Sequence, residues 1–135
     1  MNVQKMYNEE ASKKNSSMAT GFTLISIDPD NGTPSTSLGP KMGMEATSLS
    51  RTLKTMEEKG LIIRKPNPLD GRSVLIVLTD FGIEMREFSK QVVLRFDDAV
   101  RESISEDDLN TFKKVANTIL ELINSKNIYK EVKTT

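Results

Sequence analysis

One stretch of the chain decides its fold: residues 38–62, LGPKMGMEATSLSRTLKTMEEKGLI. Gly43 divides the stretch, because glycine tolerates the left-handed backbone that a tight turn between two helices requires. The segment after it is predicted to be helical from Glu45 or Ala46 up to Gly60, which takes the C′ position beyond the last helical turn. Two helices separated by such a short turn are typical of a helix-turn-helix.

The first helix of this pair is predicted to run from a Ser37 cap to about Met42. Serine is a favoured N-cap residue, since its hydroxyl accepts a hydrogen bond from a free backbone N–H of the first turn. Pro40 would then lie in the first turn, where its missing N–H is tolerated. Residues 28–37, DPDNGTPSTS, are predicted to form the loop before this helix.

The second helix has two faces of different chemistry. At 100° per residue, Leu49, Leu53 and Met56 fall on one face together with Thr52, which is the pattern of a helix packed on a core. The opposite face is mostly polar and consists of Thr47, Ser50, Arg51, Lys54 and Glu58. The N-terminal half of this face is small and basic. Short side chains and an Arg or Lys are what a helix needs to enter the major groove of DNA and contact bases and phosphates.

A β-hairpin is predicted directly after the helix-turn-helix. Residues 61–65, LIIRK, and 72–78, RSVLIVL, are rich in β-branched side chains and predict two strands. The segment between them, PNPLDG at 66–71, is a turn by composition. A hairpin in this position is the wing of a winged helix-turn-helix.

The remainder of the chain is predicted to be helical, over residues 2–14, from Ser16 or Ser17 to about Ile27, from Thr79 to about Ser103, and from Ser105 to about 125. Apolar residues recur at helical spacing over 81–100 and 109–123, more than a winged helix alone can cover. We therefore expect a mainly α fold with a small β-hairpin wing. Residues 1–27 and 79–125 would form a helical dimerisation lobe, residues 28–78 the DNA-binding lobe, and residues 126–135 a frayed tail.

Composition excludes several classes of function. The 135 residues include no Cys and no His, which excludes disulfides and thiol chemistry and argues against a transition-metal site, a cofactor or an enzyme. Net charge is zero, but residues 36–78 carry 7 basic and 4 acidic residues, an excess of +3 where a polyanion would bind. We see no secretory signal and no apolar run of the roughly 20 residues that a membrane span requires, so we expect a cytoplasmic protein.

Two segments resemble the MarR/SlyA family of bacterial regulators. One is the helix-turn-helix of residues 38–62, and the other is DGRSVLIVLTDFG at 70–82, in which an Asp-x-Arg tip precedes a Leu-Thr-x-x-Gly helix start. This sequence departs from the family pattern in three ways. Gly39-Pro40 replaces the helix-favouring pair usual in the first helix, Glu45 lies where Ser or Asp usually caps the recognition helix, and the N-terminal helix is shorter than the family's. Together the two segments cover about a third of the chain.

The resemblance implies a function and a set of DNA-contacting residues. The recognition helix would contact bases through Thr47, Ser48, Ser50 and Arg51, and Lys54 would contact phosphate. Arg72 would reach the minor groove, with Asp70 holding it in place. Ser37 is the remaining residue of the expected DNA-binding set. It also implies a homodimer on double-stranded DNA, most simply a repressor, under the control of a small aromatic ligand. The alternative is a winged helix used only for protein interaction, which would need neither the polar face around Arg51 nor Arg72.

Overall fold

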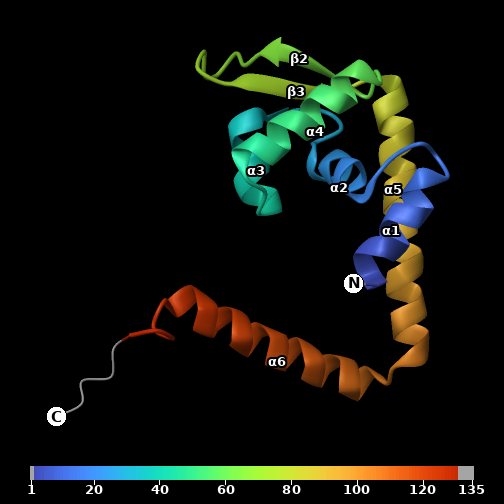
Figure 1. The fold of residues 1–135 in the computed structure, drawn as a ribbon, viewed down its shortest axis with the longest axis vertical. Helices are drawn as coiled ribbons and strands as arrows, with labels where there is room; N and C mark the ends of the chain where they lie inside the picture. The colour runs from blue at the N-terminus through green and yellow to red at the C-terminus, as the bar shows by residue number, and fades with distance from the viewer. Residues whose placement is uncertain (1, 131–135) are drawn as a thin grey trace. The chain divides into compact units, whose positions relative to one another are not determined.

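The computed structural model describes residues 2–130 and divides into two compact units, one up to residue 94 and one from residue 95. The chain is mainly helical with one small sheet, which confirms the predicted fold class (Figure 1). In chain order the elements are α1 (Asn2–Ser12), α2 (Met18–Ser26), β1 (Thr33–Pro34), α3 (Ser35–Met42), α4 (Ala46–Glu58), β2 (Ile62–Pro66), β3 (Val74–Leu78), α5 (Asp80–Ser103) and α6 (Glu106–Ser125). Within residues 2–130, no helix combines the length and the apolar character needed to cross a membrane.

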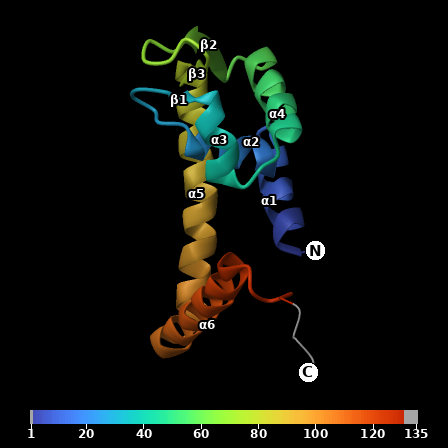
Figure 2. The same cartoon turned by 90° about the vertical axis from the view of Figure 1, so that its left-hand side faces the viewer.

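The wing is a three-stranded antiparallel sheet with the order β1-β3-β2, not a hairpin alone (Figure 2). The third strand, β1, lies within the predicted loop 28–37 and pairs Thr33 with Ile76 and Pro34 with Leu75. Two residues are too few to show an alternation of apolar and polar side chains, so the sequence carries no signal for this strand. Pro34 fits there because proline is tolerated in an edge strand.

The predicted Ser37 cap is wrong. Helix α3 begins at Ser35 with Pro34 in the N-cap position and no side-chain cap, because the pairing of β1 carries the chain straight into the helix. Ser37 is therefore a helical residue with an exposed side chain. Pro40 lies inside α3 rather than in its first turn. Its missing N–H leaves a carbonyl one turn earlier to be solvated, and the exposed position of Pro40 allows water to do so.

The other helix ends follow the predicted signals closely. Ser17 caps α2 by accepting a hydrogen bond from the Thr20 N–H at 3.2 Å, and Ser105 caps α6 by accepting one from the Asp108 N–H at 3.1 Å. The Thr79 hydroxyl accepts a bond from the Gly82 N–H at 3.0 Å, as expected for the cap of α5. Helix α1 ends at Ser12, two residues earlier than predicted.

Two glycines are required in this fold, one for its backbone conformation and one for a close approach. Gly43 has a left-handed backbone, φ 63°, and joins α3 to α4 as predicted. Gly82 lies against the backbone of the segment before β2: a Cβ atom at this position would collide with the Leu61 carbonyl oxygen. A glycine is thus required where α5 starts, and this explains the glycine of the Leu-Thr-x-x-Gly segment.

The buried core lies entirely in the first unit. Helix α4 contributes Leu49, Leu53 and Met56, which are 5%, 3% and 0% exposed, as its apolar face predicts. The other buried apolar residues come from α2, α3, the sheet and the start of α5: Leu24, Ile27, Leu38, Leu61, Ile62, Ile76, Leu78 and Met85. These contacts fix the helix-turn-helix and the wing to one another.

Candidate nucleic-acid interface

Helix α4 presents a continuous polar face to solvent. Its core residues hold the helix on one side, and the residues predicted to contact DNA are all exposed on the other: Thr47, Ser48, Ser50, Arg51 and Lys54. Neither Arg51 nor Lys54 forms a salt bridge with any described residue. Both cations are therefore available to a polyanion without first breaking an ion pair.

No side chain caps the N-terminus of α4, where the polar face begins. Glu45 occupies the N-cap position but makes no side-chain capping bond. The first backbone N–H groups of a helix have no partner within the helix, and they carry the positive end of its dipole. An uncapped helix N-terminus next to Thr47 and Ser48 can thus accept an anion such as a phosphate.

The tip of the wing is held by hydrogen bonds from two side chains. Asn67 accepts a bond from the Leu69 N–H at 3.0 Å and donates one to the Ser73 hydroxyl at 2.8 Å. The Asp70 carboxylate accepts a bond from the Arg72 backbone N–H at 3.0 Å. These bonds support the turn, and the Arg72 side chain is exposed to solvent beside it.

Asp70 and Arg72 do not form an ion pair between their side chains. Of the two arrangements that their spacing allows, a side-chain pair or a bond to the backbone, the structure has the second. The Arg72 guanidinium makes no salt bridge to a residue within 2–130. Asp70 therefore positions the backbone of Arg72 and leaves its charge free.

The predicted residues lie at three places on the first unit. Five share the exposed face of α4, Asp70 and Arg72 lie at the tip of the β2–β3 hairpin, and Ser37 is exposed on α3. A salt bridge of 3.2 Å between Arg64 and Glu57 ties β2 to α4. Lys65 was not predicted as a contact, although it is an exposed cation on β2; a single Lys in a strand gives no distinctive pattern.

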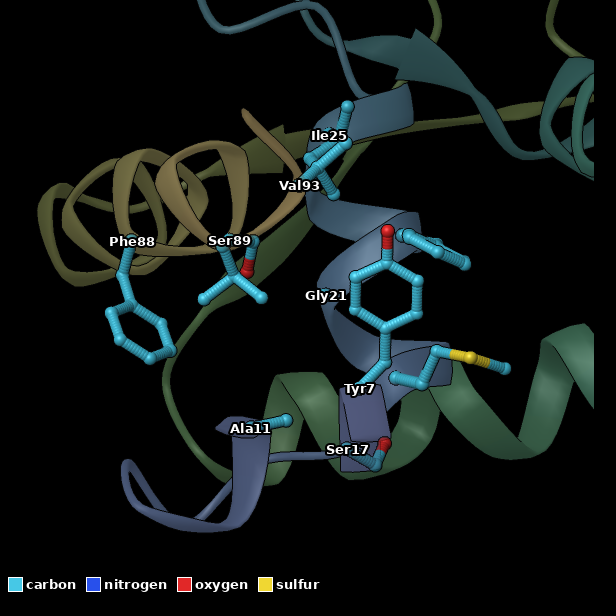
Figure 3. Close-up of a pocket in the computed structure, with 11 residues that line it drawn as sticks. Tyr7, Ala11, Ser17, Gly21, Ile25, Phe88, Ser89 and Val93 are labelled. Atoms are coloured by element: carbon cyan, nitrogen blue, oxygen red, sulfur yellow. The ribbon is translucent and has the colours of Figure 1, made fainter. Parts of the chain in front are cut away.

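A separate apolar pocket lies between α1, α2 and α5 of the first unit (Figure 3). It is a small pocket, open to solvent on one side, and is lined by Tyr7, Ala11, Ser17, Met18, Gly21, Phe22, Ile25, Phe88, Ser89, Val92 and Val93. The rings of Tyr7 and Phe22 meet edge to face, with centroids 5.5 Å apart. None of these lining residues is charged, so the lining of the pocket is largely apolar.

Comparison with known proteins agrees with this architecture. The sequence model of the MarR family matches residues 17–74, which include the helix-turn-helix and most of the wing. An organic hydroperoxide resistance transcriptional regulator of Bacillus subtilis is 36% identical over 90 residues, which are 67% of this chain and 60% of that protein. This chain thus matches less than two thirds of that relative's length.

Solved structures share the fold over most of their length. The MepR–DNA complex of S. aureus has a TM-score of 0.79 at 20% identity, covering 87% of this chain and 88% of the other. A MarR mutant of E. coli complexed with operator DNA has a TM-score of 0.75 at 25% identity, covering 87% and 84%. With the helix-turn-helix, the wing and the matched family segment in agreement, this chain belongs to the MarR family of winged-helix proteins.

Proposed function

We propose that this protein is a sequence-specific DNA-binding transcriptional regulator. The observation that carries the proposal is the exposed polar face of α4, with two unpaired cations opposite three buried anchors. A helix of this kind fits the major groove, while the wing tip would bring Arg72 to the adjacent minor groove, whose negative potential favours arginine. The MarR mutant of similar fold that was solved with operator DNA supports this assignment.

The regulator would act as a homodimer through its terminal helices, residues 1–27 and 79–125. Helix α6 has no buried residue, and most of its large apolar side chains, including Phe112 and Ile119, are more than half exposed. A second copy of the chain would cover them and place two recognition helices one DNA turn apart. A dimer bound at a promoter would block access to it, which is the repressor mode that we expect.

A small aromatic ligand would control this binding. The apolar pocket between α1, α2 and α5 has the chemistry to hold an aromatic ring, because its lining is apolar apart from a few hydroxyl groups. With no Cys among the 135 residues, a thiol-based response to peroxide is not available to this chain.

The test of DNA recognition is a selection of bound DNA from a random pool, followed by titrations on the selected site. If Arg51 contacts a guanine, Arg51→Ala should lose about 1–3 kcal/mol of binding free energy on that site and relax its sequence specificity. Lys54→Ala should weaken binding to all DNA sequences alike, and it should lower the slope of log affinity against log salt concentration by about one unit. A pool that yields no enriched sequence would contradict the proposal and favour a protein-interaction role.

A further inference from the structure

Three methionines line one groove of the first unit, beside the helix-turn-helix. Helices α2 and α3 lie side by side there (Figure 1), and the groove between α2 and the end of α3 is open to solvent. Met18 is the first residue of α2, Met42 is the last residue of α3, and Met44 follows two positions later. The rest of the lining is Ala19, Phe22 and Ser26. All three methionines are partly exposed, and we call this feature the methionine groove.

The other methionines of the described chain lie elsewhere. Met56 and Met85 belong to the buried core, where they are 0% and 6% exposed. Met6 is partly exposed on α1, but it does not line the groove. Because the sequence contains no Cys, methionine thioethers supply its only sulfur atoms. An oxidant from solvent would thus reach the sulfur atoms of the groove before those of the core.

Met44 occupies a position at which a change of polarity has structural consequences. Its backbone N–H donates a hydrogen bond of 2.9 Å to the Gly39 carbonyl oxygen, across the left-handed residue Gly43. Its side chain, like that of Met42, packs against the buried apolar cluster. The next residue, Glu45, is the N-cap of α4. A polar group on the Met44 side chain would therefore act at the turn that joins α3 to α4.

This turn is tightly packed. A Cβ atom added to Gly39 would lie 3.2 Å from the Met44 carbonyl oxygen and 3.7 Å from the side chain of Leu49, which is an anchor of α4. Interiors packed at this density do not absorb an added group without movement of their neighbours. An oxygen atom added to Met44 would thus be accommodated by a shift of the turn or by exposure of its side chain.

We propose that the methionine groove is a site of oxidation by hydroperoxides, and that its oxidation destabilises the turn between α3 and α4. The methionine sulfur attacks the terminal oxygen of the hydroperoxide, so that an S–O bond forms and the O–O bond breaks. Sulfur loses two electrons and becomes a sulfoxide, while the hydroperoxide gains them and leaves as the alcohol, which keeps the proton. The sulfoxide oxygen is polar, so its burial against the apolar cluster is unfavourable.

The turn also determines where α4 lies relative to the rest of the first unit. Helix α4 begins at Ala46, two residues after Met44, and Leu49 on its first turns is held in the same buried cluster. Destabilisation of the turn would therefore disturb the helix that we propose contacts DNA. This consequence for DNA binding rests on the proposed function, whereas the oxidation and its effect on stability do not.

Peptide mass spectrometry of the full chain, sampled during treatment with tert-butyl hydroperoxide, tests the order of oxidation. The three methionines of the groove should gain an oxygen atom roughly tenfold faster than Met56 and Met85, because oxidation follows exposure. Equal rates in the groove and in the core would overturn the proposal. Met6, which is also partly exposed, should react at a rate similar to that of the groove.

Thermal unfolding of the oxidised protein tests the structural effect. The unfolding midpoint of the parent should fall by several degrees after treatment. The double variant Met42→Leu, Met44→Leu should keep its own midpoint, because leucine is similar to methionine in volume and has no sulfur to oxidise. Met6→Leu is the matched control: it removes a partly exposed methionine outside the groove, and its midpoint should fall as far as that of the parent.

Met44→Leu alone should lose less than the parent on oxidation, and it tests the proposal even if the double variant folds poorly. An equal fall of the midpoint in the parent and in both Leu variants would overturn the inference. So would a parent whose groove methionines are fully oxidised with no change in its midpoint. Because neither measurement contains DNA, these results are distinct from a failure to bind an operator.

Discussion

The helix-turn-helix and helix α6 are both amphipathic, but only the first has its apolar face covered. In α4 the three anchors Leu49, Leu53 and Met56 are almost completely buried by α2, α3 and the sheet. In α6 the corresponding residues stay open: Phe112 is 67% exposed and Ile119 is 52% exposed. The two helices thus share an apolar and polar pattern, but within the described chain only α4 has its apolar face buried.

This difference separates two sources of stability. Burial of apolar surface contributes about 25 cal/mol per Å², and the first unit gains it from its own residues. The apolar residues of α6 gain little of this stabilisation within the described chain, since no residue of this helix is buried. The comparison predicts that substitutions in the first core change the free energy of unfolding, whereas substitutions on α6 change the state of assembly.

The largest effect is expected in the core, from Leu38→Ala. Leu38 is 0% exposed and packs in the cluster that joins α3 to α4 and the sheet. Removing it should cost about 2–5 kcal/mol of the free energy of unfolding, because a cavity remains where the side chain was. Denaturant titration measures the loss, and sedimentation should show an unchanged mass. A loss below 1 kcal/mol would mean that the core is not closed as described.

The next effect is expected on α6, from Ile119→Asp. A charge in the proposed dimer interface should weaken association by roughly a hundredfold, about 3 kcal/mol. Sedimentation at micromolar concentration should then change from about twice the 15.1 kDa chain mass to the single mass. Asn117→Asp adds the same charge at an exposed polar position of α6 and should leave the mass unchanged. A parent protein that is already monomeric would contradict the proposed dimer interface on α6.

The sequence predicts those parts of this molecule that depend on neighbouring residues. Helical spacing placed the anchors of α4, and the Ser17, Thr79 and Ser105 caps are confirmed by their hydrogen bonds. The strand β1 and the start of α3 at Ser35 were missed, because both depend on pairing with β3, about forty residues away.

The bond between Lys59 and Asn15 shows this limit most clearly. Lys59 donates to the carbonyl oxygen of Asn15, which lies 44 positions earlier in the chain, and no local pattern links the two residues. Lys59 taken alone is an ordinary surface cation at the end of a helix. Only the packing of α4 against the α1–α2 connection brings it to Asn15.

A smaller effect is expected at the wing, where a substitution should change DNA binding but leave the buried core intact. Arg72→Ala should reduce the free energy of DNA binding by about 1–3 kcal/mol, because the minor-groove contact is lost. Since Arg72 is exposed and makes no salt bridge to a described residue, the thermal unfolding midpoint and the mass should not change. Titration on one selected site at fixed salt provides the affinity. Parent-like binding would exclude the wing as a DNA contact.

The smallest effect is expected from Asp70→Ala, in which two consequences oppose one another. Loss of the carboxylate removes the acceptor for the Arg72 backbone N–H, and a hydrogen bond of this kind contributes about 0.5–1.5 kcal/mol. It also removes a negative charge close to the phosphates, which by itself should favour binding. Positioning should prevail, so Asp70→Ala should bind more weakly than the parent but more tightly than Arg72→Ala.

Asp70→Asn separates the two consequences, because its amide oxygen can still accept the bond from the Arg72 N–H while the charge is gone. If Asp70 acts by positioning, this variant should bind DNA at least as tightly as the parent, and only the Ala variant should lose affinity. Both variants are measured on the same site over a range of salt concentrations. Equal losses in the Asn and Ala variants would show that the carboxylate charge, rather than its bond to the backbone, is what the wing requires.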